Sequence, residues 1–509
     1  MLLYLALKTK MLNRKKLSEN VVNQIKSFAF YDLTQEQQLL IDKLISDQEL
    51  KERYKNYGLC QECQQLNTGI DWCQTCNAKH FQEEFKNWSS NNDDIDEFIL
   101  SHQFEATNSN EVLEWIPYKQ FTEIEYLAEG GFSKVYKAKW TSGRIEYWDV
   151  ENNYWKRTKT HPDWTIALKI LNDSQNMATD LLQEITYHKL FSSNQIVKCH
   201  GISQETKTKN YVIVVNYMRD GNLRQCLKNN HKKLSFRNKF FQLQTIIKGL
   251  NSIHEKKLVH RDLHVGNILN KIISGNVLCY IADLGLCRPV SEKDNKSVYG
   301  VLPYVAPEVL RNKGYNQASD IYSFGIIASE IISGFPPYYD LPHDEFLALK
   351  ICQGLRPKFM IRVPQLLEDL IKQCWDANPL NRPTASELDK ILSDWHWNIG
   401  DENDTEFYRQ VKEVAKVNEL FSESPVYKVH SQAIYTSRLL DFKNLPEPQN
   451  SQEINKLFYK LTEEMENLRI TDPIKFNEEL VKRFSNPQIG KEEKVKKEQT
   501  STQIQILPK

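Results

Sequence analysis

Four polar residues near the middle of the chain have types and spacings that suit chemistry on an anion. Asp262 and Asn267 lie in HRDLHVGNIL, which we expect to be a loop because an apolar, strand-like run follows it. Asp283 stands between an apolar run and Gly285, a setting in which a carboxylate can coordinate a divalent cation at a strand end. Lys169 lies inside the apolar run TIALKIL, where burying its ammonium group is costly unless it meets a phosphate or a carboxylate.

A helix and a hairpin upstream would position these groups. The helical stretch TDLLQEITYHKLF carries Glu184, the natural carboxylate partner of Lys169, and Asp180 is an alternative one turn earlier on the same face. LAEGGFSKVYKA is typical of a strand, a turn with Gly130 and Gly131, and a second strand. Such a hairpin can fold over phosphates.

Taken in order, these segments resemble the signature motifs of the eukaryotic protein kinase superfamily. The resemblance runs over residues 118–397, more than half of the chain. YVIVVNYMRDGNL and the CW…NRPT ending resemble the tyrosine-kinase-like branch of serine/threonine kinases most closely. Further matches to late kinase motifs come from Ala306, Pro307 and Glu308 in VLPYVAPEVL, Asp320 and Gly325 in SDIYSFGI, and Arg382 in CWDANPLNRPT.

The resemblance implies an α+β protein kinase fold with two lobes, a small antiparallel β lobe with one helix and a large, mainly helical lobe. In that fold Arg382 would pair with Glu308 and clamp the end of the activation segment. The implied activity is transfer of the γ-phosphoryl group of ATP to serine or threonine of proteins in intracellular signalling, with tyrosine left open.

The same resemblance assigns a role to each catalytic residue. Asp262 would receive the proton of the acceptor hydroxyl, and Asn267 and Asp283 would hold Mg²⁺ against the phosphates. Lys169 would contact the α- and β-phosphates, and Glu184 would hold Lys169 in place. The implied nucleotide-binding set is Leu127, Ala128, Gly130, Val135, Ala167, Lys169, Val215 (the gatekeeper), Asn216, Met218, Asn267, Leu269 and Asp283, with residues 216–218 as the hinge.

The phosphate loop departs from the family pattern. Ala128 and Ser133 replace the first and third glycines, whereas Gly130 keeps the second, which matters most for close approach of the backbone to phosphate. All the charged groups that carry the reaction are present. We therefore expect an active enzyme, and a catalytically weak pseudokinase that binds nucleotide as a signalling scaffold is the alternative.

The acceptor preference is open at the sequence level. His264 stands where many serine/threonine kinases have lysine, and Val301 where they often have threonine. The activation segment offers Ser291, Ser297 and Tyr299 as phosphorylation sites that could pair with Arg261, with ordinary solvated loop residues as the alternative.

Two CxxC pairs lie outside the kinase region. CQEC and CQTC supply Cys60, Cys63, Cys73 and Cys76, and two such turns can bring four thiolates around Zn²⁺. A redox pair or two unrelated turns are the alternatives. We expect a structural zinc that serves protein interaction, and the lack of basic residues in this module disfavours nucleic-acid binding.

An insertion separates the second strand from the lysine strand. TSGRIEYWDVENNYWKRTKTHPDW reads as an extended hairpin in which Tyr147, Trp148, Tyr154 and Trp155 alternate with polar residues. We expect these aromatic side chains to cover the sheet of the small lobe, and a partner surface is the alternative.

Composition limits the remaining possibilities. The chain has 509 residues and 66 basic against 66 acidic side chains, so no global field favours nucleic acid or an anionic membrane. No run reaches the roughly 20 apolar residues that span a bilayer, and the start MLLYLAL has the wrong order for a secretory signal. Ten cysteines in so long a chain suit a reducing compartment, which we expect to be the cytoplasm.

The expected domain order follows from these motifs. Residues 1–57 would be a helical segment with two short amphipathic helices between 15 and 55, 58–85 the zinc module, and 86–117 a linker with a docking helix. The kinase domain would occupy 118–397. Residues 398–509 would form a tail with helical pieces at 407–421, 454–468 and 474–484 and a disordered end. Regulatory proteins could bind the zinc module, the insertion or the tail.

Overall fold

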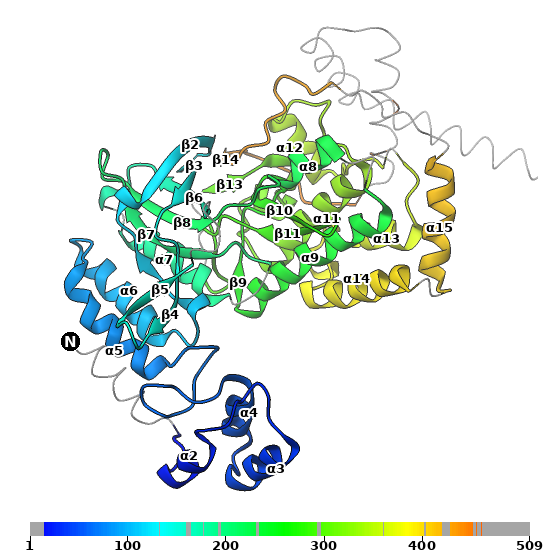
Figure 1. Cartoon of the computed structure of the whole chain (residues 1–509). Coiled ribbons are helices and arrows are strands. Elements are labelled where there is room, and N and C mark those ends of the chain that lie inside the picture. Colours follow the sequence, from blue (N-terminus) through cyan, green and yellow to red (C-terminus); the bar gives the residue numbers. More distant parts are fainter. Residues whose placement is uncertain are drawn as a thin grey trace, which may run out of the picture. The chain divides into compact units, whose positions relative to one another are not determined.

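The computed structural model describes residues 15–131, 133–158, 164–176, 178–191, 195–230, 234–292, 297–359, 361–401, 404–419 and 428–450, with 455 and 460. The chain divides into two compact units, Met1–Asp220 with Tyr280–Cys287 and Gly221–Cys279 with Arg288–Lys509 (Figure 1). The expectations for the apolar start, for helices at 454–468 and 474–484 and for the disordered end lie outside the described residues.

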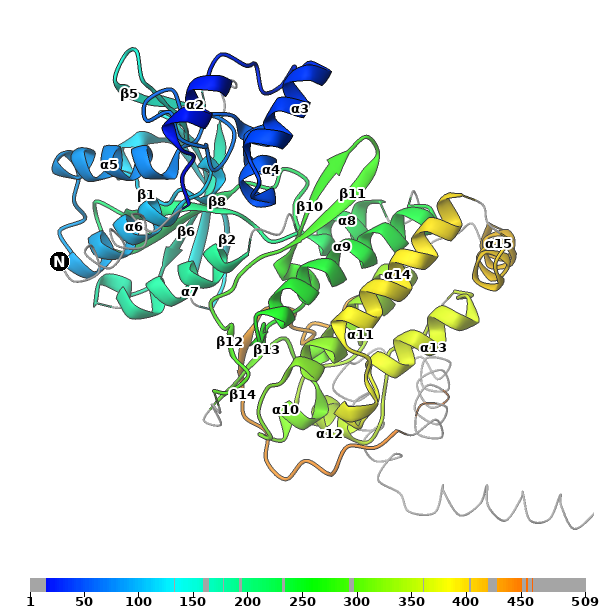
Figure 2. The same ribbon diagram turned by 90° about the horizontal axis from the view of Figure 1, so that it is seen from below.

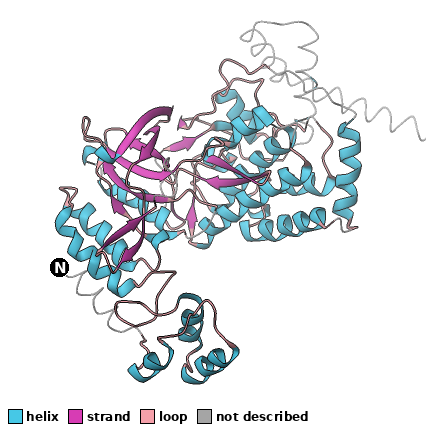
Figure 3. Cartoon of the chain, in the orientation of Figure 1, coloured by secondary structure: helices cyan, strands magenta, loops and turns pink. Residues whose placement is uncertain are grey.

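The first unit is built on a six-stranded sheet, counted over the described residues, in the order β1-β7-β8-β6-β3-β2. Its strands are β1 (Glu114–Trp115), β2 (Phe121–Glu129), β3 (Ser133–Trp140), β6 (Thr165–Leu171), β7 (Cys199–Gln204) and β8 (Tyr211–Asn216). Strand β6 alternates, because Ile166, Leu168 and Ile170 are buried in one apolar cluster while Lys169 faces the other side. Figure 3 shows this sheet in magenta.

The predicted antiparallel sheet is wrong at one edge, where β1 pairs with β7 in parallel. Gly201 makes this pairing possible, because a Cβ atom there would lie 2.1 Å from the carbonyl oxygen of Glu114. The extra strand comes from the segment before residue 118, so main chain outside the expected kinase region completes the sheet.

Helix α7 (Ala178–Leu190) covers the face of the sheet that carries Lys169, and helix α6 (Asp93–Glu105) packs beside it. Ile95 and Ile99 of α6 join Leu181 and Ile185 of α7 and Ile213 of β8 in one fully buried cluster. Helix α6 begins at the N-cap residue Asn92, whose side chain accepts from the backbone of residues 94 and 95. The segment before the expected kinase region therefore supports α7 directly.

Three helices lie within residues 15–58, α2 (Glu19–Ile25), α3 (Gln35–Leu44) and α4 (Gln48–Tyr57). The prediction of two helices is wrong because it missed α4, in which half of the residues are charged and only Leu50 and Tyr54 are buried. Its N-cap residue Asp47 accepts from the backbone of Leu50, and the buried Tyr54 hydroxyl donates to the Ile25 carbonyl at 2.9 Å.

The insertion forms the hairpin of β4 (Ile145–Asp149) and β5 (Tyr154–Arg157), but its tryptophans do not cover the sheet as predicted. They contact helix α5 (Gln74–Glu84), where Trp155 stacks on Phe81 at 4.3 Å and Trp148 stacks on His80 at 3.9 Å between ring centroids. These rings therefore bury apolar surface against the cysteine module instead of the sheet.

The second unit is mainly helical. Its helices are α8 (Leu223–Asn230), α9 (Phe236–Glu255), α10 (Pro307–Leu310), α11 (Gln317–Ser333), α12 (Glu345–Cys352), α13 (Gln365–Cys374), α14 (Ala385–Gly400) and α15 (Glu406–Glu419). Helix α11 is almost wholly buried and ends at Gly334, which adopts φ 81°. Helices α9 and α14 run side by side (Figure 2). The α+β content that the sequence predicts is confirmed.

Short strand pairs complete this unit. A hairpin joins β10 (Ile268–Ile273) to β11 (Asn276–Ile281), and β9 (Leu258–Val259) pairs with β12 (Arg288–Pro289). Strand β13 (Val298–Gly300) pairs with β14 (Arg438–Leu440), which comes from the tail (Figure 2). Among the described residues, no helix is both long and apolar enough to cross a membrane.

Candidate active site

The ammonium group of Lys169 is held between two carboxylates. Its Nζ atom lies 2.7 Å from Oε1 of Glu184, which α7 supplies, and 2.7 Å from Oδ1 of Asp283, which follows β11. The alternative partner Asp180 has no described side chain, and Glu184 makes the contact. Asp283 adopts φ 59° and also accepts from the backbone N–H of Gly285.

Electrostatics keep this lysine charged. Burial lowers the pKa of the Lys169 ammonium, but the charges of Asp283 and Glu184 outweigh burial, so its pKa is raised above the usual value. His188 lies 3.9 Å from Glu184, and burial together with the charge of Lys169 lowers its pKa to about 4. His188 is therefore neutral near pH 7 and adds no second positive charge to the cluster.

Five of the expected nucleotide-binding residues share the face of the sheet that carries Lys169. In the register, Val135 is opposite Lys169 and Ala128, and Ala167 is opposite Val215. Because directly opposed residues of paired strands project to one face, these side chains form one apolar floor around the ammonium group. The floor consists of Ala128, Val135, Ala167 and Val215.

The other expected residues of the first unit border this floor. Leu127 is exposed on β2, and Met218 is buried beyond the end of β8. The side-chain oxygen of Asn216 lies 2.7 Å from Nε2 of His200, so only its backbone is available as a hinge. A Cβ atom at Gly130 would meet nothing closer than the Ser133 carbonyl at 3.8 Å, so the fold itself does not require glycine there.

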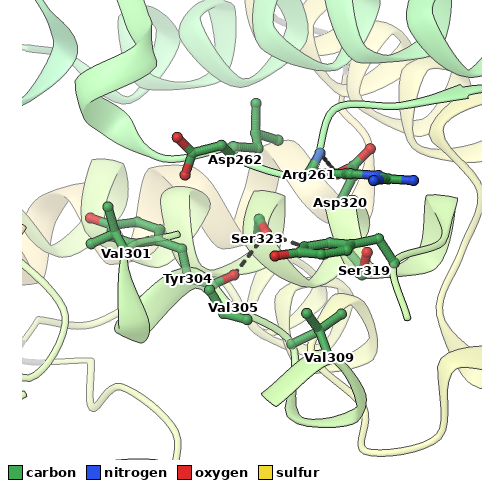
Figure 4. A pocket seen from close by; sticks show the side chains of 12 residues that line it. Arg261, Asp262, Val301, Tyr304, Val305, Val309, Ser319, Asp320 and Ser323 are labelled. Carbon is green, nitrogen blue, oxygen red and sulfur yellow. Dashed lines mark hydrogen bonds between the residues drawn. The ribbon is translucent and has the colours of Figure 1, made fainter. Parts of the chain in front are cut away.

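The loop around Asp262 lies in the second unit. Figure 4 shows Arg261 of this loop beside Asp320. Arg261 adopts φ 71°, a left-handed conformation that is costly for a residue with a Cβ atom. Asp320 of α11 holds this conformation, because its carboxylate accepts from the backbone N–H groups of His260 at 2.8 Å and of Arg261 at 3.0 Å. The buried Asp320 carboxylate thus holds the backbone of this loop in place.

Asn267 and His264 surround the Asp262 carboxylate. The Asn267 amide donates to the Asp262 carbonyl at 2.9 Å, and Nε2 of His264 lies 3.7 Å from Oδ2 of Asp262. Nδ1 of His264 accepts from the Gly266 N–H, so the ring proton resides on Nε2 and faces the carboxylate. Oδ1 of Asp262 is buried without a hydrogen-bond partner among the described residues. Leu269 follows on β10, half-buried.

The activation segment is anchored at its end. The guanidinium group of Arg382 forms two parallel hydrogen bonds to the Glu308 carboxylate, at 2.6 and 2.8 Å, and the Arg382 side chain is fully buried. The predicted pair is therefore confirmed. Ser291 and Ser297 are exposed, and Arg261 donates to the Glu292 carbonyl at 3.2 Å, so phosphorylation in this segment stays a prediction.

A family model described as protein tyrosine and serine/threonine kinase matches residues 121–392, more than half of the chain. The chain belongs to this family. The match begins at β2 and ends within α14, so it includes every catalytic residue expected from the sequence. The N-terminal helices, the cysteine module and the tail lie outside the matched kinase region.

Several curated kinases are similar to this chain. A probable serine/threonine-protein kinase of Dictyostelium discoideum is 27% identical over 292 residues, covering 55% of this chain and 20% of the relative. A dual specificity protein kinase of the same organism is 28% identical over 269 residues, covering 49% and 11%. A tyrosine-protein kinase of Girardia tigrina is 28% identical over 281 residues, covering 53% and 52%. The chain thus spans a fifth or less of the two Dictyostelium relatives and about half of the third.

The four paired cysteines come together outside the kinase region. Their sulfur atoms all lie within 4.8 Å of one another, with Cys63 and Cys73 at 3.7 Å and Cys60 and Cys76 at 3.9 Å. Hydrogen bonds to Cys60 and Cys63 raise the pKa of the Cys73 and Cys76 thiols, so these four groups do not all ionise without a cation among them. His80 is not part of the cluster, because its Nε2 lies 2.7 Å from Glu62.

Sequence reasoning missed the roles of two residues near Asp262 and one segment. The sequence identifies Asp320 as a motif residue. Its hydrogen bonds to the Asp262 loop join residues about 60 positions apart, and local sequence patterns do not predict such contacts. His264 was noted as a departure, and its contact with Asp262 could have been inferred from their spacing in HRDLH. The pairing of the tail with the activation segment had no sequence signal.

Proposed function

We propose that this chain is an active, ATP-dependent protein kinase whose two compact units are the small and large lobes of the kinase fold. The observation that carries the proposal is the Lys169 ammonium group held at 2.7 Å from both Glu184 and Asp283. A buried cation fixed between two carboxylates is preorganised to neutralise phosphate oxygens, which is the main requirement of phosphoryl transfer.

The chain's own groups would then divide the work of the reaction. Lys169 orients the α- and β-phosphates, and Val135 and Ala167 of the apolar floor receive the adenine ring. Asp262 accepts the proton of the acceptor hydroxyl, for which its unpaired Oδ1 is available. Asn267 and Asp283 offer the amide and carboxylate oxygens that Mg²⁺ prefers, and the ion would neutralise charge on the transferred group.

The degenerate phosphate loop does not favour the pseudokinase alternative. Gly130 keeps an open approach for phosphate, and Ala128 adds only a methyl group to the floor of the site. The lysine, both carboxylates, the amide and Asp262 are all present. We therefore propose that the enzyme is active, although Ala128 and Ser133 make its phosphate loop less flexible than glycines would.

We propose that this kinase belongs to the tyrosine-kinase-like branch and that serine and threonine are its acceptors. Phosphorylation assays with tyrosine-containing peptides would show whether it also modifies tyrosine. The similar kinases bear serine/threonine, dual specificity and tyrosine names, so acceptor choice varies among the relatives. His264 beside Asp262 takes the place of the usual lysine, which puts an imidazole ring rather than an ammonium group next to the acceptor.

We also propose that the cysteine cluster holds one structural Zn²⁺. Four thiolates around zinc at Zn–S distances near 2.3 Å lie about 3.8 Å apart, close to the separations of 3.7 Å between Cys63 and Cys73 and 3.9 Å between Cys60 and Cys76. Cys73 and Cys76 lie at the start of α5, where the helix dipole favours thiolates. The ion would hold α5 under the β4–β5 hairpin, so its role is structural.

Location and partners remain proposals. All ten cysteines are free of disulfides, which agrees with a reducing, cytoplasmic compartment. ATP and protein substrates are the proposed partners of the kinase region.

Transfer of labelled phosphate from Mg-ATP to casein tests the proposal. Asp262→Asn should reduce the rate by several orders of magnitude, while Glu255→Gln, an exposed acid at the end of α9, should leave it unchanged. Equal background incorporation by the wild type and Asp262→Asn would end the enzyme proposal.

A further inference from the structure

The tail crosses the second unit along a continuous track. The backbone N–H of His430 donates to the Tyr339 carbonyl at 2.8 Å, and the N–H of His343 donates to the Gln432 carbonyl at 3.0 Å. Farther along, the Arg311 guanidinium donates to the Leu445 carbonyl at 3.2 Å. The track ends where Asn450 caps the backbone N–H of Ala377 at 2.9 Å, so residues 428–450 are held at both ends.

The middle of the track is a strand added to the activation segment. Strand β14 pairs with β13 in antiparallel register, with Val298 opposite Leu440, Tyr299 opposite Leu439 and Gly300 opposite Arg438. Main-chain pairing of an extended segment to an exposed strand is a general mode of peptide recognition, in which alternate side chains supply the specificity. Leu440 supplies one anchor, because it is 5% exposed, whereas Leu439 is 53% exposed.

Tyr435 supplies a second anchor. The Arg224 guanidinium lies 4.0 Å from its ring centroid, and the His343 ring packs edge-on at 4.8 Å. The Tyr435 hydroxyl donates to the Pro337 carbonyl at 3.0 Å, so this hydroxyl is already engaged. The two anchors fix the register of the residues between them.

That register places Ser437 next to the residue pair that lies beside Asp262. A Cβ atom on Gly300, the partner of Arg438, would lie 3.7 Å from Oδ1 of Asp262. Ser437 immediately precedes Arg438 in the chain, and Val301, which follows Gly300, lines a pocket together with Asp262 (Figure 4). Oγ of Ser437 and Oδ1 of Asp262 are both buried without a hydrogen-bond partner among the described residues. The neighbouring Thr436 is exposed.

We propose that residues 428–450 are the chain's own acceptor segment, docked as a protein substrate would dock, and that Ser437 is a site of intramolecular phosphorylation. The inference rests on the proposed kinase function and deepens it. It also identifies the edge of β13 as the acceptor strip, with an apolar contact three residues after the acceptor and an aromatic contact two residues before it. While docked, the tail excludes other acceptors from this strip.

The chemical step is the ordinary one of the proposed function. Oγ of Ser437 attacks the γ-phosphorus of ATP, a new Oγ–P bond forms, and the bond from the γ-phosphorus to the bridging oxygen of ADP breaks. The hydroxyl proton passes to Asp262, and the products are phosphoserine and ADP. The added negative charge beside Asp262 would repel the carboxylate and favour release of the strand.

The test follows phosphate on the full chain. Protein pretreated with phosphatase is mixed with Mg-ATP at several protein concentrations, and peptides covering 428–450 are mapped by mass spectrometry over time. We expect phosphate on Ser437 at a rate that does not depend on protein concentration. Ser437→Ala should abolish phosphate in this segment, and Thr436→Ala should retain it.

A matched pair of variants tests the docking. Leu440→Asp should slow phosphorylation of Ser437 by about tenfold or more, because it places a charge at a buried anchor, and should lower the KM for casein. Leu439→Asp, on the exposed side of the same strand, should change neither. If Leu440→Asp loses helical circular dichroism, Tyr435→Ala tests the other anchor in its place.

Three results would overturn the inference. These are phosphate elsewhere with none on Ser437, a Ser437 rate that rises in proportion to protein concentration, and equal effects of Leu439→Asp and Leu440→Asp. If casein is phosphorylated while Ser437 is not, the proposed function stands and the inference fails. If neither is phosphorylated, both fail.

Discussion

The two segments that flank the kinase region both pack onto it, but in different ways. The segment before it places Ile95 and Ile99 of α6 at 0% exposure in a cluster shared with α7 and the sheet. The segment after it contributes a strand of three residues, β14, and an ion pair between Arg311 and Glu447, whose glutamate side chain is 79% exposed. The first contact is continuous with the core of its unit, whereas the second consists of a short strand pair with one buried anchor, Leu440, and an exposed ion pair.

This difference predicts different functions for the two flanks. Removing buried apolar groups costs far more free energy than breaking a short strand pair and an exposed ion pair. The N-terminal flank should therefore be a permanent support for α7, which carries Glu184, and the tail should be a removable occupant of the strip beside Asp262. The predictions below test this contrast.

Loss of zinc should have the largest effect, and only on the N-terminal flank. Zinc binding contributes on the order of 10 kcal/mol to small zinc modules, so Cys76→Ser should unfold the cysteine module. We expect hydrogen exchange to rise across α5 and the β4–β5 hairpin and to stay unchanged across 428–450. Metal analysis should find one zinc ion per wild-type chain and none in the variant. Cys352→Ser, a buried cysteine outside the cluster, is the control, and a zinc-free wild type would refute the site.

Ile99→Ala should destabilise the first unit by about 2–5 kcal/mol, because it leaves a cavity in a fully buried cluster. Since α7 loses its support, kcat should fall as well. Glu97→Ala on the exposed side of the same helix should have little effect on either quantity. Thermal unfolding and casein phosphorylation measure both, and equal effects of the two substitutions would contradict the supporting role of α6.

The motifs of the kinase region could be predicted because phosphoryl transfer demands particular residue types at ordered positions. Lys169 and Glu184 were paired correctly from such spacing. Helix α4, the partner of Trp155 and the strand β14 could not be predicted, because each depends on contacts between distant segments rather than on local periodicity. The four cysteines were readable as a cluster, since thiols in two CxxC turns have few other uses.

The contact between the N-terminal flank and Lys198, the residue before β7, should depend on pH. Lys198 donates to Asn110 at 3.0 Å, and burial, aided by the charges of Arg144 and Lys189, lowers its pKa to about 7. The unfolded chain keeps this proton up to about pH 10.4, so the unfolded state binds more protons between pH 7 and 10. Stability from this group should therefore rise with pH in that window, by at most about 1.4 kcal/mol per pH unit. Urea unfolding of Lys198→Met should lack this rise, and an identical profile would refute the assignment.

The smallest effect should come from the exposed ion pair of the tail. Arg311→Gln removes the contact with Glu447 and should cost the docked tail only about 0.2–1 kcal/mol. The difference from wild type should shrink at high salt. Hydrogen exchange at residues 438–440 measures it, and a loss as large as that of Ile99→Ala would remove the contrast between the two flanks.

The central claim is that Lys169 and Asp262 serve one reaction in different roles. The most direct test is a single-turnover assay at saturating Mg-ATP, with the affinity for ATP measured on the same samples. Lys169→Met should weaken ATP binding and transfer together, whereas Asp262→Asn should bind ATP as the wild type does and transfer phosphate at least about a thousandfold more slowly. Transfer by both variants at the wild-type rate would contradict the account.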